Sequence, residues 1–273
     1  MAKTKYTFER KEKKYLLDAA KYQRVMRALG PHLRPDEYAQ STVCSVYYDT
    51  PDFELIRTSL EKPTYKEKLR VRSYGVPAEG DEVFVELKKK YKGVVFKRRM
   101  TMGVDEATNL ASSRAVTDPQ TQVEHEVAWF MQAYENLAPA CYVAYDRLAF
   151  VGRADSSLRV TFDRNVRARD FDLDLAAGDY GEPLLPEGHV VMEIKARGAM
   201  PLWLVRTLSN LEVYPGSFSK YGTFYKRLLG AAPNVVQVPA AWAPRGRAAG
   251  DANTLAPAGI PFRRMIPNEV VYA

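Results

Sequence analysis

The sequence predicts an α+β fold in which a large antiparallel sheet is accompanied by shorter helices. Three observations predict it. Long segments alternate polar and apolar residues with period two, which is typical of strands. Segments with apolar residues at helical spacing lie between these strands. Hydrophobic residues make up 46% of the 273 residues, including 17 Tyr and 11 Phe, and this is enough for a packed core.

The elements can be placed in chain order. Period-two alternation predicts strands at 5–16, 41–49, 65–74, 82–91, 94–101, 140–152, 157–164, 166–173 and 188–197. Helices are expected at 19–29, shortly after Pro51, at 121–137, from Pro201 through Ser209, and at 217–229. Asp18 is placed to cap the first helix, which Gly30 and Pro31 should end. Pro201 suits the first position of its helix.

The composition changes after residue 230, so we expect a folded domain over 1–230 and a C-terminal tail over 231–273. The tail carries six prolines and many alanines without a sustained period. Trp242, Phe262 and Arg263-Arg264 form a candidate docking point within it, and an ordinary terminal extension is the alternative.

Charge and cysteine content narrow the class of protein. The formal charge is +7, which favours an anionic partner but is smaller than the imbalance typical of nucleic-acid binders. Cys44 and Cys141 lie in apolar, strand-like segments, and we expect two buried, reduced thiols. The sequence shows no secretory signal and no apolar run long enough for a transmembrane helix, which favours a cytoplasmic protein.

One strand carries an unusual face. In residues 65–72, Lys66, Lys68, Arg70 and Arg72 occupy alternate positions, so the four cations share one face of the strand. Taken alone, such a strand is most often the solvent-exposed face of a sheet.

The pattern recurs on at least six strands. The further sets are Arg10, Glu12 and Lys14; Phe84, Glu86, Lys88 and Lys90; Val95, Lys97 and Arg99; Tyr145 and Arg147; Arg159, Thr161 and Asp163; and Val191, Glu193, Lys195 and Arg197. A dry interior is excluded, because burying an unpaired charge costs several kcal/mol. Two arrangements remain: an open sheet with its basic face in water, or a closed barrel with a water-filled interior that holds a polyanion. A lone glutamate in such a set is either an ion-pair partner or a ligand for Mg²⁺ or Mn²⁺.

Seven segments resemble the VTC domain, the polyphosphate polymerase branch of the triphosphate tunnel metalloenzymes (the CYTH-like superfamily). In chain order they are RKEKKY (10–15), SVYYDT (45–50), YKEKLRVRSY (65–74), VFVELKKKYKGVVFKRR (83–99), YVAYDR (142–147), VVMEIKAR (190–197) and SFSKYG (217–222). The resemblance covers about 5–229. It implies a closed antiparallel barrel, a tunnel with helices packed outside, that binds a nucleoside triphosphate and a divalent metal.

The resemblance also implies a reaction and a set of site residues. In the polymerase branch the γ-phosphoryl group of ATP passes to a growing inorganic polyphosphate chain, with Mn²⁺ or Mg²⁺ as cofactor. The implied catalytic residues are Arg70, Arg72, Lys88, Arg147 and Lys220. Further phosphate-binding residues are expected at Lys14, Lys97, Tyr145, Arg159, Lys195 and Ser219, and near the tunnel mouth at Lys66 and Lys68. Glu193 resembles the metal-binding glutamate, and Glu86 is expected to assist it.

The first strand departs from the wider superfamily. Arg10-x-Glu12-x-Lys14 stands where the hydrolase and cyclase branches have Glu-x-Glu-x-Lys, and this favours the polymerase branch. Two other functions stay open: hydrolysis of tripolyphosphate or a nucleoside triphosphate on the same scaffold, and non-catalytic binding of polyphosphate or nucleic acid. We expect no nucleic-acid partner, because a closed tunnel too narrow for bases would exclude one.

Overall fold

The computed structural model describes residues 10–113, 116 and 119–230. Its strands form one sheet in the order β1-β9-β7-β6-β2-β3-β4-β5, with β8 paired to β7. The pairs whose register is defined are all antiparallel, so the predicted α+β class with an antiparallel sheet is confirmed.

The element bounds are as follows. The strands are β1 (Arg10–Leu17), β2 (Leu33–Asp49), β3 (Tyr65–Tyr74), β4 (Glu82–Tyr91), β5 (Val94–Gly103), β6 (Ala138–Gly152), β7 (Arg159–Arg169), β8 (Glu182–Pro183) and β9 (Val190–Arg197). The α-helices are α1 (Ala19–Leu29), α2 (Glu54–Leu60), α3 (Val104–Ser113), α4 (Gln122–Ala133), α5 (Leu202–Asn210) and α6 (Lys220–Gly230). Short 3₁₀ turns lie at Gly30–His32 and Leu175–Ala177.

The chain divides into two compact units. Unit 1 contains the described residues of Met1–Thr42, Tyr145–Val166 and Leu185–Phe218. Unit 2 contains those of Val43–Ala144, Arg167–Leu184 and Ser219–Ala273.

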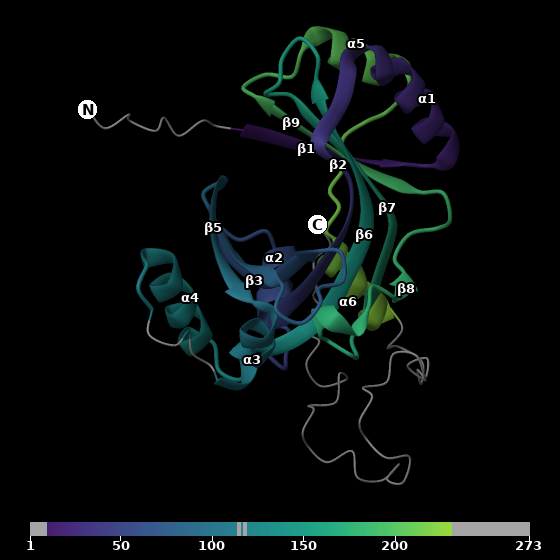
Figure 1. The fold of residues 1–273 in the computed structure, drawn as a ribbon. Coiled ribbons are helices and arrows are strands. Elements are labelled where there is room, and N and C mark those ends of the chain that lie inside the picture. Colours follow the sequence, from purple (N-terminus) through teal and green to yellow (C-terminus); the bar gives the residue numbers. More distant parts are fainter. Residues whose placement is uncertain (1–9, 114–115, 117–118, 231–273) are drawn as a thin grey trace, which may run out of the picture. The chain divides into compact units, whose positions relative to one another are not determined.

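Unit 1 has one apolar strand face covered by helices. β9 pairs with β1 on one side and with β7 on the other. Their register aligns Tyr15, Met192 and Phe162, all of which are buried with residues of α1 and α5. Figure 1 shows these two helices side by side. Asp18 caps α1 as predicted, since its carboxylate accepts a 2.7 Å hydrogen bond from the backbone N–H of Lys21.

Unit 2 is built around two successive hairpins, β3–β4 and β4–β5. β4 and β5 pair along their whole length across the two-residue turn of Lys92 and Gly93. Both turn residues have positive φ, 45° and 86°, which is typical of a type I′ turn. This turn matches the twist of the strands and sets their register.

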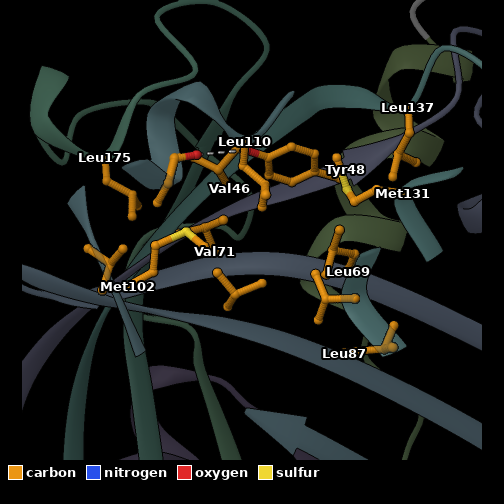
Figure 2. Packing of buried hydrophobic residues seen from close by; sticks show 14 of the residues in the cluster. Val46, Tyr48, Leu69, Val71, Leu87, Met102, Leu110, Met131, Leu137 and Leu175 are labelled. Atoms are coloured by element: carbon orange, nitrogen blue, oxygen red, sulfur yellow. Dashed lines mark hydrogen bonds between the residues drawn. The ribbon is translucent and has the colours of Figure 1, made fainter. Parts of the chain in front are cut away.

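The core of unit 2 lies on the apolar face of its strands. Figure 2 shows Leu69, Val71 and Leu87 of the sheet in one cluster with Leu110 of α3 and Met131 of α4. Because side chains alternate along a strand, an apolar face toward these helices places the intervening cations of β3, β4 and β5 on the opposite face.

Besides the two-residue strand β8, which was not predicted, three longer elements differ from the sequence prediction. β2 begins at Leu33, eight residues before the predicted 41–49 strand. The prediction missed this first half because its side chains are mostly exposed and do not alternate between polar and apolar. The predicted strands 157–164 and 166–173 are one strand, β7. Asn165 adopts a left-handed φ of 48° and donates to Asp146 Oδ2 at 2.7 Å, so the strand passes through it without ending. α3 was not predicted, although Val104, Ala107 and Leu110 bury one side of it.

Several other predictions can be compared with the structure. Cys44 and Cys141 are buried free thiols, as predicted. No helix among the described residues is long and apolar enough to cross a membrane. Strand pairing in the described part of the chain runs from β1 to β5 without a pair that joins these two strands, so barrel closure stays a prediction. Residues 5–9 of the first predicted strand lie outside the described residues, as does the 231–273 tail with Trp242, Phe262 and Arg263-Arg264.

Candidate functional site

A cationic face covers one side of β3, β4 and β5 in unit 2. The strand register aligns its side chains in rows across the three strands: Lys66 with Lys90, Lys68 with Lys88 and Lys97, Arg70 with Glu86 and Arg99, and Arg72 with Phe84. We use "cationic face" for these eight Lys and Arg side chains together with Glu86. Like charges directly opposite each other destabilise a sheet. The arrangement therefore favours an anionic ligand.

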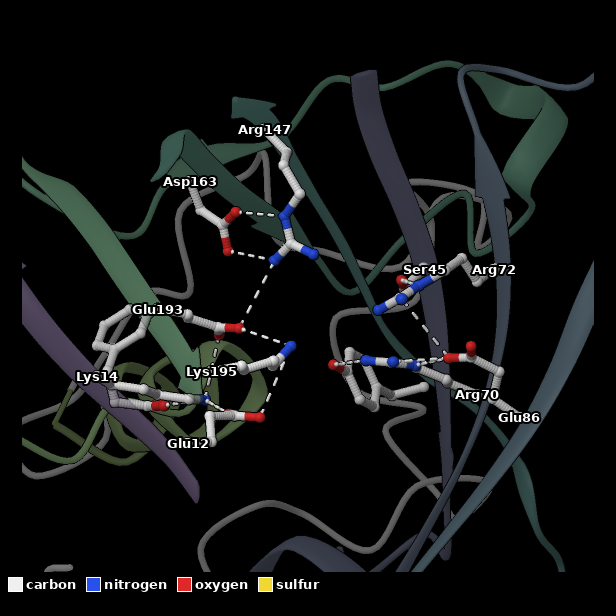
Figure 3. A network of polar contacts seen from close by, with 12 residues as sticks. Glu12, Lys14, Ser45, Arg70, Arg72, Glu86, Arg147, Asp163, Glu193 and Lys195 are labelled. Atoms are coloured by element: carbon white, nitrogen blue, oxygen red, sulfur yellow. Dashed lines mark hydrogen bonds and ion pairs between the residues drawn. The ribbon is translucent and has the colours of Figure 1, made fainter. Parts of the chain in front are cut away.

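Glu86 holds the centre of the cationic face. Arg70 Nε donates to its Oε2 at 2.7 Å, Arg99 Nε donates to its Oε1 at 2.9 Å, and Arg72 Nη1 lies 3.7 Å from Oε2 (Figure 3). Burial acts to raise the pKa of Glu86, but the three arginines outweigh it and lower the pKa to about 2. Glu86 is thus an anion at neutral pH, and it orients three guanidinium groups.

Two tyrosines connect Arg70 to the start of α6. Arg70 Nη1 donates to the Tyr47 hydroxyl at 3.1 Å, and the Tyr47 ring stacks on Tyr221 at 5.0 Å. Burial acts to raise the pKa of Tyr47, yet the neighbouring cations Arg70, Arg72 and Lys220 lower it. The Tyr221 hydroxyl donates to buried Asp49 at 2.8 Å. Asp49 also accepts from the backbone N–H groups of Leu55 and Ile56 in the first turn of α2, which anchors both helices to the end of β2.

The start of α6 carries the predicted Ser219 and Lys220. Ser219 Oγ accepts a hydrogen bond from Gly222 N at 3.1 Å, and the Lys68 ammonium lies 6.0 Å from the Tyr221 ring centroid. Ser219 and Lys220 therefore belong to unit 2 with Lys68, Arg70 and Arg72.

Lys66 contributes to the cationic face and to the packing of α2. Its ammonium donates to the backbone carbonyl of Ser59 at 2.8 Å. Burial is the main cause that lowers the pKa of Lys66, and the nearby ammonium groups of Lys90, Lys88 and Lys62 add to it. Electrostatic repulsion among the lysines at this end of the cationic face therefore acts on Lys66.

A second group of charges lies in unit 1, and we call it the paired cluster. It consists of Lys14, Arg147 and Lys195 with Glu12, Asp163 and Glu193. Figure 3 shows Glu193 facing all three cations. Its carboxylate lies 3.4 Å from Lys14 Nζ, 3.6 Å from Lys195 Nζ and 3.8 Å from Arg147 Nη2. Three cations and three carboxylates balance each other here.

Asp163 fixes Arg147 within this cluster. The Arg147 guanidinium donates two hydrogen bonds, of 2.7 and 2.9 Å, to the two oxygens of Asp163, whose side chain is 0% exposed. The same guanidinium lies 5.1 Å from the Tyr145 ring centroid. A two-pronged hydrogen bond of this kind sets the plane of the guanidinium as well as its position.

Arg159 has a different partner. Its guanidinium pairs with Asp36 of β2, and its side chain is 48% exposed. Lys14 donates to the carbonyl of Phe218 at 3.0 Å in addition to its ion pairs.

The two predicted metal ligands differ in their fit to a divalent ion. The contacts of Glu193 to its three cations exceed hydrogen-bond length, so an ion that prefers carboxylate oxygen could compete for it. Glu86 instead engages both oxygens in short bonds to arginines, which does not fit a metal ligand. No group of three or more His, Cys, Asp or Glu side chains in the described chain is arranged to hold a metal. Glu193, with Glu12 beside the same lysines, would therefore depend on phosphate oxygens to complete a metal's coordination.

The structure sorts the predicted residues into the two units. Lys66, Lys68, Arg70, Arg72, Glu86, Lys88, Lys97, Ser219 and Lys220 belong to unit 2, and Lys14, Tyr145, Arg147, Arg159, Glu193 and Lys195 belong to unit 1. The predicted set omits Arg99, Asp163, Glu12 and Tyr47. Arg99 lies on the same strand face as Lys97, and Asp163 lies on the same strand face as Arg159. The alternation of side chains along a strand was therefore enough to predict both as site residues.

The family model for the VTC domain matches residues 9–229. The chain belongs to this family. The VTC domain thus spans both the cationic face and the paired cluster.

Two curated relatives are subunits 4 of the vacuolar transporter chaperone complex. The subunit from Trypanosoma cruzi (strain CL Brener) is 25% identical over 286 residues, covering 85% of this chain and 36% of the relative. The subunit from Trypanosoma brucei brucei (strain 927/4 GUTat10.1) is 25% identical over 292 residues, covering 87% and 36%. The chain therefore spans about a third of the length of these relatives.

Solved structures show weaker likeness. A candidate adenylate cyclase from Bacillus halodurans has a TM-score of 0.49 at 14% identity, covering 76% of this chain and 92% of that one. A candidate adenylyl cyclase from Hippeastrum, described as having dominant triphosphatase activity, has a TM-score of 0.46 at 15% identity, covering 79% and 95%. Both scores are below 0.5, so the fold description rests on the strand pairing of this chain.

Proposed function

We propose that this VTC domain is an ATP-dependent polyphosphate polymerase, which transfers the γ-phosphoryl group of ATP to a growing inorganic polyphosphate chain. The observation that carries the proposal is the cationic face, where eight Lys and Arg side chains surround one carboxylate. Membership of the VTC domain family supports it. The closed tunnel implied by the resemblance is part of the proposal.

The cationic face supplies phosphate binding. Arg70 and Arg72, held by Glu86, present guanidinium groups that suit the paired oxygens of phosphates. Lys68, Lys88 and Lys97 add positive charge along the strands, and Ser219 and Lys220 add a hydroxyl and an ammonium at the start of α6. These groups neutralise charge on the transferring phosphoryl group, which is the main requirement of this chemistry.

The paired cluster supplies the candidate metal site. Glu193 and Glu12 would hold Mn²⁺ or Mg²⁺, which when bound would polarise phosphate oxygens. Lys14, Lys195 and Arg147 hold Glu193 in place until then. The acceptor is a phosphate oxygen that is already ionised near neutral pH, so the reaction requires no protein nucleophile.

The test incubates purified protein with ATP and Mn²⁺ and resolves the products on a gel. Long phosphate chains support the polymerase, whereas free orthophosphate alone supports hydrolysis of triphosphates on the same scaffold. Binding of polyphosphate without turnover would identify a non-catalytic module.

Two substitutions test the assigned groups. Arg70→Ala and Glu193→Ala should each lower the rate on the order of a hundredfold or more, the loss seen when one preorganised electrostatic group is removed. Arg98→Ala is the matched control, since Arg98 lies on the opposite face of β5 and pairs with Glu126 at 3.0 Å. If Glu193→Ala matches the wild-type rate, the metal assignment is wrong.

A further inference from the structure

The cationic face ends in a pair of aromatic side chains. Tyr74 follows Arg72 by two residues on β3 and so shares its face, and Phe84 lies directly across from Arg72 on β4. The two rings meet edge to face, with centroids 5.9 Å apart and an interplanar angle of 72°. The Arg99 guanidinium lies 4.5 Å from the Phe84 ring centroid.

Tyr74 is unusual among the tyrosines of this sheet because it is exposed on the cationic face. The residue is 54% exposed. Tyr65 and Tyr91 are exposed to a similar degree, but they occupy the alternate face of β3 and β4 and align with each other there. Tyr65 donates to Glu67 at 2.6 Å on that alternate face.

The Tyr74 ring is also held in place. It contacts Phe84 edge to face, and Phe84 in turn contacts Arg99, the residue that binds Glu86. Burial acts to raise the pKa of the Tyr74 hydroxyl, but Arg99 and Arg72 outweigh it and lower this pKa. Tyr74, Phe84, Arg99 and Glu86 therefore form one connected group, which joins the aromatic pair to the centre of the cationic face.

We propose that Tyr74, supported edge to face by Phe84, is a stacking platform for the base of a nucleoside triphosphate whose phosphates lie on the cationic face. This proposal rests on the proposed function, because the proposed function assigns phosphate binding to the cationic face. Adjacent rows of side chains are about 7 Å apart, two residues along a strand. A ribose bridges an interval of this order, so a base on Tyr74 places its phosphates over Arg72 and then over Arg70 and Arg99.

The platform has a consequence for specificity. Stacking on an aromatic ring depends on the flat face that every base has, and it does not read the hydrogen-bonding edge. ATP and GTP should therefore bind with similar affinity, and inorganic tripolyphosphate should lack this contribution altogether.

The experiment compares two probes by calorimetry: the imido analogue of ATP, which resists hydrolysis, and inorganic tripolyphosphate. Tyr74→Leu should weaken binding of the analogue about tenfold, or about 1.4 kcal/mol, and leave tripolyphosphate affinity unchanged. Tyr74→Phe should keep most of the analogue affinity because it retains the ring. Tyr91→Leu, from the alternate face, is the matched control and should change neither affinity.

Equal weakening of both probes by Tyr74→Leu would overturn the platform and make Tyr74 a support for the arginines. Unchanged affinity for both probes would overturn it as well. Thermal melting of Tyr74→Leu checks that the variant is folded. If it is not, clearly different affinities of the wild-type protein for the imido analogues of ATP and GTP would overturn the platform, because stacking does not read the base edge. The comparison measures binding alone, so a wild-type protein that makes no polyphosphate would refute the proposed function without deciding the platform.

Discussion

The cationic face of unit 2 and the paired cluster of unit 1 arise from the same sequence pattern but differ in charge balance. In both, charged side chains occupy alternate positions along a strand. In unit 1 the register sets Lys14 opposite Glu193 and Lys195 opposite Glu12. In unit 2 it sets Lys68 opposite Lys88, and Lys88 opposite Lys97. The identity of the cross-strand neighbour therefore decides whether a basic side chain stands opposite a carboxylate or opposite another cation.

The largest expected effect on stability is in the paired cluster. Asp163→Asn removes the charge that pairs with Arg147, and we expect a loss of about 4 kcal/mol, within the range for breaking a buried ion pair. Urea denaturation measures it. Asp36→Asn is the control, because the exposed Arg159–Asp36 pair should contribute about 0–1 kcal/mol. Equal losses in the two variants would show that burial does not distinguish these pairs.

The next effect concerns the one carboxylate of the cationic face. The pKa of Glu86 falls from 4.5 to about 2 on folding, so its ionisation stabilises the protein above about pH 4.5. This contribution is lost as the pH falls through about 2. Glu86→Gln should cost on the order of 3 kcal/mol at pH 7, and the difference from wild type should narrow as the pH falls below 4.5.

Denaturation at pH 7, 4 and 3 tests this expectation. A difference between wild type and Glu86→Gln that stays constant over this range would mean that packing, not charge, explains the loss.

The smallest expected effect is on the salt dependence of polyanion binding, which should differ between the cationic face and the paired cluster. A cation that neutralises a bound polyanion releases counterions, so its removal lowers the salt dependence of binding. Lys88→Gln should reduce the slope of log affinity for tripolyphosphate against log salt by roughly one. Lys195→Gln should reduce it less, because Lys195 faces Glu12 and Glu193. Titrations over a series of NaCl concentrations measure both slopes, and equal slopes would remove the distinction between the two regions.

Much of the sheet and several site residues could be predicted from the sequence because both depend on local pattern. Alternation along β3 placed Arg70 and Arg72 on one face, and Asp18 with Gly30 and Pro31 bounded α1. The ion-pair partners could not be predicted in the same way. Arg147 meets Asp163 because β6 neighbours β7, and Glu193 meets Lys14 through the pairing of β9 with β1, strands far apart in sequence. Glu86, by contrast, meets Arg99 across the β4–β5 hairpin, a local contact whose register the two-residue turn sets.

The two-residue turn at Lys92 and Gly93 has an evolutionary consequence. Lys88 lies before this turn, and Lys97 and Arg99 lie after it. The length of the turn therefore sets which side chains of β5 stand opposite Lys88 and Glu86 on β4. A single-residue insertion that shifted β5 by one position would send Lys97 and Arg99 to the helix-covered side and bring Phe96 and Arg98 in their place. Lineages that keep this face should therefore tolerate substitutions within the hairpin far more readily than changes in the length of its turn.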